Sequence, residues 1–423
     1  MEISMKTEAG IPKEKCTDHT IKLLTEGYLY IPNRLRKYNT NLFETNIMCQ
    51  KVVCMSGKEA AELFYDQNLF TRKGAIPNRI QESLFGKKGI QTLDGKAHMQ
   101  RKSLFMSLMT PQRINQIIQL AEKQWEINSK QWERRYQIYL FDEASKLLFE
   151  VACKWAGVPI KKAQIKQKSL DMSAMIDALG AVGPRHWKGR CARNRCECWA
   201  STLIEEVRSD RITVPKDTAL YAIAWYKDIN NKLLSTEMAA VELINILRPI
   251  TAIATYITFG ALALHMYPEY CNNYRQGNEE YRTMFIQEVR RFYPFGPFLG
   301  ARVRNDFIRY NHHFKKGDLV FLDIYGTNHN KKIWKTPNIF DPENFRDRKD
   351  QPFDFIPQGG GDYKTGTRCP GEWLTIEILK TSFDFLAKKL AYDVPLQDFS
   401  YPLNRIPTLP KSKFIMTNIR KLK

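Results

Sequence analysis

Apolar residues recur at helical spacing over most of the chain. The pattern predicts helices over residues 110–163, 166–180 and 190–208, and one long helix over residues 239–265 that is apolar along most of its length. Shorter runs rich in alternating or β-branched residues predict strands over residues 43–55, 298–303, 319–324 and 413–418. The predicted fold class is therefore mainly α with small β-sheets.

No internal repeat interrupts this pattern, and no linker divides the chain. The 423 residues are 43% hydrophobic and 12% aromatic, which is enough to bury a large core. We therefore expect one domain over residues 1–423, with no fused reductase domain. Residues 1–17 contain no apolar run, and we expect a poorly ordered N-terminal extension there.

Basic residues outnumber acidic ones, with 65 Lys and Arg against 45 Asp and Glu, so the net charge is +20. Such a charge attracts acidic partners, anionic membranes or nucleic acid. The charges are scattered along the chain, however, and a solvated basic surface explains them better than a binding tail. Residues 183–190, GPRHWKGR, are expected to form a basic and aromatic loop, which alone is weak support for a nucleic-acid-binding protein. We expect no nucleic-acid partner.

Stable membrane insertion and a disulfide scaffold are both disfavoured. The N-terminus lacks the apolar run of a signal peptide or anchor, so a cytoplasmic protein is expected. Residues 250–267 are long enough to span a membrane, but three threonines, Gly260 and His265 favour a buried helix. The nine cysteines lack a paired framework. Cys191, Cys196 and Cys198 form one possible metal cluster, for which no fourth ligand is obvious.

The long helix over residues 239–265 contains the pair Arg248-Pro249. Proline inside a helix removes an N–H and clashes with the carbonyl four residues back, at a cost of about 3 kcal/mol, so we expect the helix to break at this pair. Arg248 lies among apolar neighbours, where an unpaired charge is costly. It therefore needs an anion, which is either a carboxylate of the protein, such as Glu242, or a substrate carboxylate that matches its planar fork.

The stretch over residues 355–373, FIPQGGGDYKTGTRCPGEW, places Cys369 between a glycine-rich loop and a segment with helical periodicity. Free N–H groups and the positive dipole end of a helix favour a thiolate there. This predicts an anionic ligand or a nucleophile, against the alternative of a small buried hydrophobic residue. Gly361 and Gly366 have the spacing of a phosphate loop, but Thr367 and Arg368 stand where that loop requires Lys and Ser or Thr.

A basic group of residues precedes the main helical region. His98, Arg101 and Lys102 have the spacing that brings side chains to one face of a helix. Three basic side chains on one face would neutralise carboxylates on a ligand, or would form a solvated basic surface.

The cysteine stretch resembles the haem-binding loop of the cytochrome P-450 superfamily. The matching residues are Phe355, Gly359, Gly360, Gly361, Arg368, Cys369 and Gly371. The resemblance implies a cytochrome P-450 fold that binds haem b, with Cys369 as the axial ligand of the iron. The other residues implied to hold the cofactor are Arg72, His98, Arg101, Lys102 and Arg368.

Two further features belong to the same resemblance, the ExxR ion pair and the centre of the long helix. Glu288 and Arg291 match the ExxR ion pair of the superfamily, and Asn344 stands where a third residue, an arginine, is usual. The pair Arg248-Pro249 replaces the acid and alcohol that ordinary members use to deliver protons to oxygen. The usual route of oxygen activation is therefore not expected here.

A narrower resemblance rests on Arg248-Pro249, on the extended loop from Gly360 to Arg368, and on the stretches DALGAVGPRHWKGR, QEVRRFYPFGPFLGARV and FDFIPQGGGDY. From about residue 20 to the C-terminus the chain is similar to the bacterial fatty-acid peroxygenases of the superfamily. The resemblance implies hydroxylation of long-chain fatty acids at the alpha or beta carbon, with hydrogen peroxide as the oxidant. It also implies that the substrate carboxylate pairs with Arg248, beside Pro249, and acts as a general acid and base.

The same resemblance implies a pocket for the apolar tail of the substrate. The positions that match this pocket are Leu84, Phe85, Ile176, Leu179, Ala252, Phe295 and Gly296. Gln91 stands where hydroxylating members have Gln and the strongest alkene-forming members have His. Because an amide does not readily donate a proton near neutral pH, we expect mainly hydroxy acids.

Two alternative activities remain open. One is a fatty-acid decarboxylase that gives terminal alkenes, and the other is a monooxygenase fed by separate reductases, so a redox partner is possible although it is not required.

Overall fold

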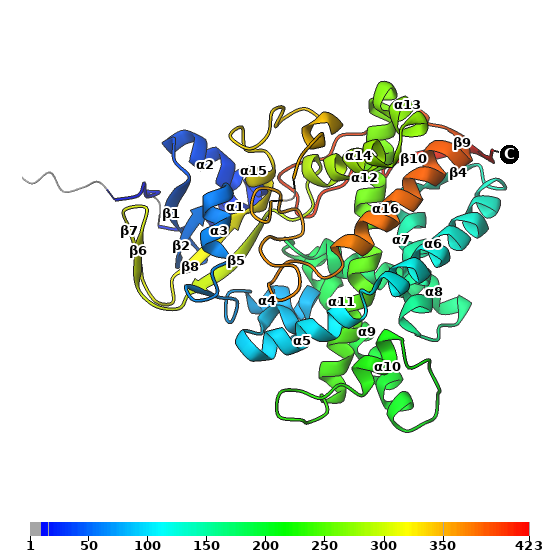
Figure 1. Cartoon of the computed structure of the whole chain (residues 1–423), viewed down its shortest axis with the longest axis horizontal. Helices are drawn as coiled ribbons and strands as arrows, with labels where there is room; N and C mark the ends of the chain where they lie inside the picture. Colours follow the sequence, from blue (N-terminus) through cyan, green and yellow to red (C-terminus); the bar gives the residue numbers. More distant parts are fainter. Residues whose placement is uncertain (1–9, 16, 350, 423) are drawn as a thin grey trace, which may run out of the picture.

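The computed structural model describes residues 10–15, 17–349 and 351–422. A helical body fills most of the molecule, and a smaller β-rich lobe lies beside it (Figure 1). The helices are α1 (Thr20–Glu26), α2 (Tyr30–Tyr38), α3 (Lys58–Phe64), α4 (Asn78–Ile80), α5 (Gly95–Ser107), α6 (Pro111–Trp132), α7 (Leu140–Ala156), α8 (Lys162–Asp177), α9 (Pro184–Arg208), α10 (Ala219–Ala224), α11 (Thr236–Ala252), α12 (Ala254–Met266), α13 (Pro268–Gln276), α14 (Glu279–Phe292), α15 (Ile324–Asn328) and α16 (Glu372–Asp384). The predicted fold class, mainly α with small sheets, is confirmed.

The strands are short and lie mostly in the lobe. They are β1 (Leu42–Ile47), β2 (Gln50–Met55), β3 (Phe70–Thr71), β4 (Gln137–Tyr139), β5 (Phe298–Val303), β6 (Phe307–Arg309), β7 (His312–Phe314), β8 (Leu319–Asp323), β9 (Leu390–Asp393) and β10 (Ile415–Lys421). In the described part of the chain they form a five-stranded sheet of order β1-β2-β8-β5-β3, a three-stranded sheet β4-β10-β9 and the pair β6-β7. The β1-β2 hairpin predicted over residues 43–55 is confirmed.

The N-terminal segment lies against this lobe. The expected extension over residues 1–17 falls in large part outside the described residues, which begin at residue 10. In the described part, the Ile11 side chain is buried and the backbone N–H of Glu14 donates to the carbonyl of Glu44 in β1 at 2.9 Å. Residues 10–15 therefore follow the edge of the large sheet.

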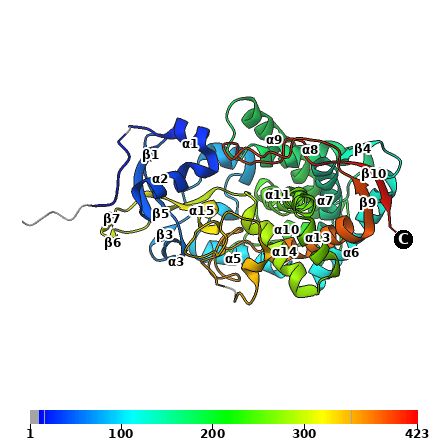
Figure 2. The ribbon, with the colours of Figure 1, turned by 90° about the horizontal axis from the view of Figure 1, so that it is seen from above.

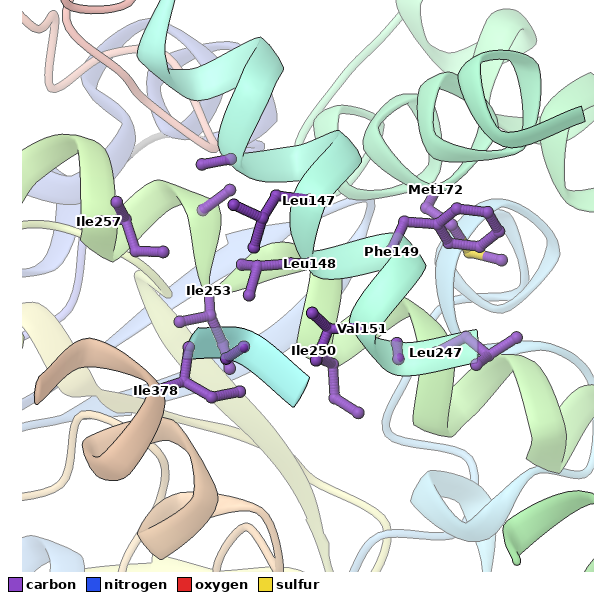
Figure 3. Packing of buried hydrophobic residues seen from close by; sticks show 14 of the residues in the cluster. Leu147, Leu148, Phe149, Val151, Met172, Leu247, Ile250, Ile253, Ile257 and Ile378 are labelled. Atoms are coloured by element: carbon purple, nitrogen blue, oxygen red, sulfur yellow. The ribbon is translucent and has the colours of Figure 1, made fainter. Parts of the chain in front are cut away.

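Helices α11 and α12 run through the centre of the helical body. Figure 2 shows α11 nearly end-on, and its neighbours are α7, α8 and α9. In Figure 3, Leu147, Leu148 and Val151 of α7 face Ile250 and Ile253, and Ile378 of α16 closes the cluster. In the described chain, the run Thr236–Met266 is long and apolar enough to cross a membrane, but 94% of its most apolar window is buried in the protein.

The long central helix breaks one turn later than its sequence predicts. Pro249 lies inside α11, which continues to Ala252, and the break falls at Ile253 before α12 begins. The Ile253 N–H donates to the carbonyl of Ile250 at 3.2 Å, so the ladder tightens to an i→i+3 bond at that point. The expected break at Arg248-Pro249 is therefore wrong, because close packing on every side keeps α11 helical through its proline.

Residues 183–190 do not form the expected loop. Pro184 is the first residue of α9, where a proline is well tolerated because the first N–H groups of a helix have no partner within it. Trp187 and Lys188 are exposed on this first part of the helix. The basic and aromatic segment is therefore a solvated helical face rather than a binding loop.

Candidate active site

Cys369 lies in the loop that precedes α16, close to the centre of the molecule. Its backbone N–H donates to the carbonyl of Gln358 at 3.0 Å, and the side-chain amide of Gln358 donates to the Cys369 Sγ at 3.6 Å. Gly359 and Gly361 turn the loop with φ of +90° and +83°, values that favour glycine. The loop thus holds the sulfur in a fixed position with an amide donor against it.

Burial raises the pKa of the Cys369 thiol, although the backbone N–H of Gly371, the Lys102 ammonium and the Gln358 amide all act to lower it. The expected depression of this pKa by a helix N-terminus is therefore wrong for the protein without a ligand. Cys369 lies before the N-cap residue Gly371 rather than in the first turn, and desolvation outweighs the nearby donors. A bound cation would supply the missing stabilisation, since a metal deprotonates a coordinating thiol.

Two cations, the buried Lys102 and the partly buried Arg72, lie close to the cysteine loop. Lys102 of α5 donates to the carbonyl of Arg368, and burial lowers its pKa to about 8. Burial likewise lowers the pKa of Arg72 to about 10, and its guanidinium lies 4.0 Å from the centre of the Phe64 ring. Within the described residues, no carboxylate forms an ion pair with Lys102 or Arg72. Buried cations without such partners suit anionic groups on a ligand.

A cavity of about 140 Å³ lies between Arg72 and the glycine-rich loop. His98 lines the same cavity, and desolvation lowers the pKa of its imidazole. Its other walls include Tyr65, Asp94, Gly360, Gly361 and Thr367. The predicted basic face of α5 is therefore buried beside the cysteine loop rather than solvated.

Arg101, the third member of that face, is paired within the protein. Its guanidinium forms a buried ion pair with Glu242 of α11. It consequently points toward the central helix, whereas Lys102 points toward the cysteine loop. Arg368 of the loop is held by Glu372, with Nε and Oε2 2.6 Å apart.

These residues fit a thiolate-bound haem. The Cys369 thiol, with an amide donor against it, supplies an iron ligand. Lys102, Arg72 and His98 supply positive or hydrogen-bonding groups for the two propionates. The fit rests on Lys102 and Arg72, because neither cation forms an ion pair with a carboxylate of the described residues.

Arg248 is the decisive residue on α11. Its side chain is 6% exposed, its Nη2 donates to Asn245 Oδ1 at 3.3 Å, and its Nε has no hydrogen-bond partner among the residues that the structure describes. Burial, together with the charge of Arg193, lowers the pKa of this guanidinium to about 9, while Cys369 acts in the opposite direction. Among the described residues no carboxylate pairs with Arg248. The alternative that Glu242 neutralises it is wrong, because Glu242 is turned to Arg101.

A chain of polar side chains connects Arg248 with the Arg101–Glu242 ion pair. Asn245 Nδ2 donates to Glu242 Oε2 at 3.1 Å and to Gln91 Oε1 at 3.3 Å, while its Oδ1 accepts from Arg248. Sequence reasoning did not identify Asn245 as a site residue. The available signal was its spacing, because Glu242, Asn245 and Arg248 follow one another at i+3 and share a helix face.

The residues predicted to line a fatty-acid pocket come from four segments. Leu84 and Phe85 end a π-helical turn, η2 (Gln81–Phe85), and the centre of the Phe85 ring lies 5.5 Å from the Arg248 Cζ. Phe295 stacks on Tyr256 at 4.7 Å, and Gly296 follows it. The remaining positions are Ile176 in α8, Leu179 just after it, and Ala252 at the end of α11. Only Phe85 is placed directly against Arg248, and the lining roles of the others stay predictions.

A buried ion pair ties α14 to the segment that precedes the cysteine loop. Glu288 and Arg291 of α14 form a bidentate pair, and Arg291 also donates to the carbonyls of Asn328, Pro337 and Ile339. Asn344 Nδ2 donates to Glu288 Oε1 at 3.4 Å, so the amide occupies the place of the usual arginine without its charge. This makes the ExxR pair part of the core rather than a surface helix pair.

The cysteines Cys191, Cys196 and Cys198 of α9 do not form a site. Cys191 and Cys198 are exposed, whereas Cys196 is buried. In the part of the chain that the structure describes, no group of His, Cys, Asp and Glu side chains has the arrangement of a metal site.

Comparison with known proteins agrees with this geometry. The cytochrome P-450 family model matches residues 276–386, which include α14 and the cysteine loop. A protopanaxadiol 6-hydroxylase of Panax ginseng is 23% identical over 379 residues, covering 83% of this chain and 79% of that protein.

Solved structures are more similar. Cytochrome P450EX alpha with myristic acid is 43% identical, covers 98% of this chain and 100% of its own, and superposes with a TM-score of 0.95. A variant of cytochrome P450SP alpha is 42% identical, covering 96% and 100% of the two chains, with a TM-score of 0.94. A variant of cytochrome P-450 OleT in complex with arachidonic acid is 37% identical, covering 98% and 99%, with a TM-score of 0.95.

The chain belongs to the cytochrome P-450 family. Within that family it belongs to the branch that these three solved structures represent, which confirms the resemblance to the bacterial fatty-acid peroxygenases.

Proposed function

We propose that this protein hydroxylates long-chain fatty acids at the alpha or beta carbon, with hydrogen peroxide as the oxidant. The observation that carries the proposal is Arg248, a buried guanidinium on the central helix that has no carboxylate partner among the described residues. Similar proteins have been solved with myristic acid and with arachidonic acid, which supports a fatty acid as the missing anion.

The substrate carboxylate binds to the free side of Arg248. Asn245 accepts one N–H of the guanidinium and thereby fixes its plane, which leaves the Nε edge for a carboxylate. A carboxylate oxygen held there is also a proton carrier, since it accepts a proton from peroxide and returns it. The substrate carboxylate thus acts as the general acid and base. This explains why α11 has Arg248-Pro249 where ordinary members of the family have an acid and an alcohol.

The tail of the substrate provides the binding free energy. Each buried methylene contributes about 0.8 kcal/mol, so a dozen contribute roughly 10 kcal/mol. Phe85 covers the head group, because its ring lies over the guanidinium. A short acid would bury too little apolar surface to offset the desolvation of its charged head.

The cofactor is proposed to be haem b, with Cys369 as the iron ligand. Haem supplies the oxidising chemistry when it is bound, by activating the oxygen of peroxide. Gln358 donates to the sulfur, and Lys102, Arg72 and His98 would hold the propionates. Arg101 and Arg368 are paired with Glu242 and Glu372, and they support the site through those carboxylates.

Gln91 favours hydroxylation over the formation of alkenes. Its Oε1 accepts a hydrogen bond from Asn245, so the residue is fixed at the edge of the polar chain. The amide does not deliver a proton near neutral pH, whereas an imidazole would. We expect hydroxy acids as the main products from myristate and, for Gln91→His, a larger share of terminal alkene. Mass spectrometry of the products decides this, and a predominance of alkene in the unmodified protein would favour the decarboxylase.

The test of the proposal uses the haem-loaded protein and myristate. Turnover with hydrogen peroxide and no reductase is expected, together with the thiolate-type spectrum of the carbon monoxide complex. If turnover requires reductases and NADPH and peroxide does not replace them, the protein is a monooxygenase of the same family and the proposal is wrong.

A further inference from the structure

A second buried arginine lies next to the Arg248 site. Arg193 of α9 is 1% exposed, and within the described part of the chain its Nη2 has no hydrogen-bond partner. Its Nη1 donates to the carbonyl of Leu84 at 2.8 Å, and its Nε donates to Glu197 at 2.6 Å. A buried arginine at such a place must serve either packing or charge, because its desolvation is costly.

The hydrogen bond to Leu84 closes the end of the π-helical turn η2. The last carbonyls of a helix have no partner within it and carry partial negative charge, which a cation satisfies. Gly86 follows with φ of +82° and packs so closely that a Cβ there would meet the Arg193 guanidinium and Val241 of α11. Arg193 therefore holds the backbone on both sides of Phe85, the residue that covers Arg248.

The charge of Arg193 also reaches Arg248. It is one of the groups that lower the pKa of the Arg248 guanidinium, so the two cations repel each other in the absence of an anion. Glu197 neutralises the charge of Arg193 only in part, because 35% of the Glu197 side chain is exposed and solvent screens its carboxylate. A carboxylate bound at Arg248 would relieve the repulsion between both cations, whereas a neutral head group would not.

We propose that Arg193 is a positioning and selectivity residue of the carboxylate site: it holds the turn that carries Phe85 against Arg248, and its charge increases the preference for an acid over a neutral lipid. The inference rests on the proposed function, because it takes a fatty acid as the ligand. Arg193 acts through Phe85 and Arg248 and does not itself contact the substrate.

The experiment compares myristate with 1-tetradecanol, which has the same chain length and no charge. Each is titrated into the haem-loaded protein, and the shift of the Soret band gives the two dissociation constants. Their ratio is the readout, because a loss of packing weakens both ligands alike and leaves the ratio unchanged. For Arg193→Gln, the preference for myristate is expected to fall about tenfold, which corresponds to about 1.4 kcal/mol.

Two further variants separate charge from shape. Glu197→Gln removes the neighbouring carboxylate and is expected to raise the preference about threefold, the smaller value reflecting its exposure. Arg193→Lys retains the charge without the two fixed hydrogen bonds, and its ratio is expected to stay within about twofold of the unmodified value. Lys188→Gln is the control, since it removes one positive charge from the exposed part of α9.

The outcomes distinguish this inference from the proposed function. If the unmodified protein does not bind myristate, the proposed function fails. If it binds myristate but Arg193→Gln leaves the ratio unchanged, or Glu197→Gln lowers it, the role of Arg193 in selectivity is wrong. Should Arg193→Gln fail to fold, Glu197→Gln and Arg193→Lys still decide, because the ratio is expected to rise when the carboxylate is lost and to stay unchanged when the cation is retained.

Discussion

Replacing Arg248 by methionine should make the protein more stable and much less active. The change keeps the approximate length of the side chain and removes a charge that is 6% exposed and has no carboxylate partner in the described structure. Without a ligand, removal of this charge is expected to raise the free energy of unfolding by about 1 to 4 kcal/mol, the range found when buried charges give way to apolar residues.

The effect on fatty-acid binding has the opposite sign. In Arg248→Met the carboxylate would be buried without a partner, which costs about 3 to 5 kcal/mol. This corresponds to a loss of roughly 150-fold to 4,000-fold in kcat/KM for myristate. Myristate stabilises the folded protein by an amount that depends on its dissociation constant, so this stabilisation should disappear when the variant no longer binds myristate.

Thermal unfolding of the haem-loaded protein with and without myristate tests both effects in one experiment. The matched control is Arg134→Met, which removes an exposed arginine at the end of α6 and should leave both midpoints unchanged. The reasoning is refuted if myristate stabilises Arg248→Met as much as the unmodified protein. It is also refuted if the variant without ligand is less stable although its haem content is normal.

Three further predictions concern the cofactor and the core. Cys369→Ala should abolish the thiolate-type spectrum of the carbon monoxide complex, and retention of that spectrum would mean that another residue binds the iron. Glu288→Gln should lower the free energy of unfolding by about 3 to 5 kcal/mol, because it breaks a fully buried ion pair and leaves Arg291 charged; denaturant titration measures this, and a loss below 1 kcal/mol would contradict it. Burial raises the pKa of Asp323 to about 7 from 3.8, so between pH 4 and 7 the folded protein binds more protons than the unfolded chain and stability falls as pH rises, by roughly 4 kcal/mol in total. Asp323→Asn should flatten this part of the stability profile, and an unchanged slope would assign the effect to another group.

Much of the fold could be predicted because its signals are local. The helical periodicity of the central segment and the alternation in β1 and β2 are properties of neighbouring residues, and both were correct. The break at Ile253 and the helical start of α9 were missed. Whether a helix bends at a proline or begins at one depends on the packing around it, which the periodicity of one segment does not contain.

The residues of the candidate site could likewise be identified from local sequence signals, whereas their contacts could not. Cys369, Arg248 and the basic face of α5 were identified from residue type and spacing. The direction of the pKa shift at Cys369 was wrong, since burial depends on elements that are distant in sequence. The partner of Arg101, the polar chain through Asn245 and the position of Arg193 also depend on contacts between separate helices.

The amino-acid sequence by itself determined the family of this protein, its helical body, and the presence of a cysteine ligand and a lone arginine in apolar surroundings. The tertiary structure alone decided that Glu242 belongs to Arg101 and that Arg248 has no carboxylate of the described chain. The physical reason is that charge pairing depends on distance in space. Glu242 and a substrate carboxylate were both open in the sequence as the partner of Arg248, and packing between α5 and α11 brought Glu242 to Arg101 instead.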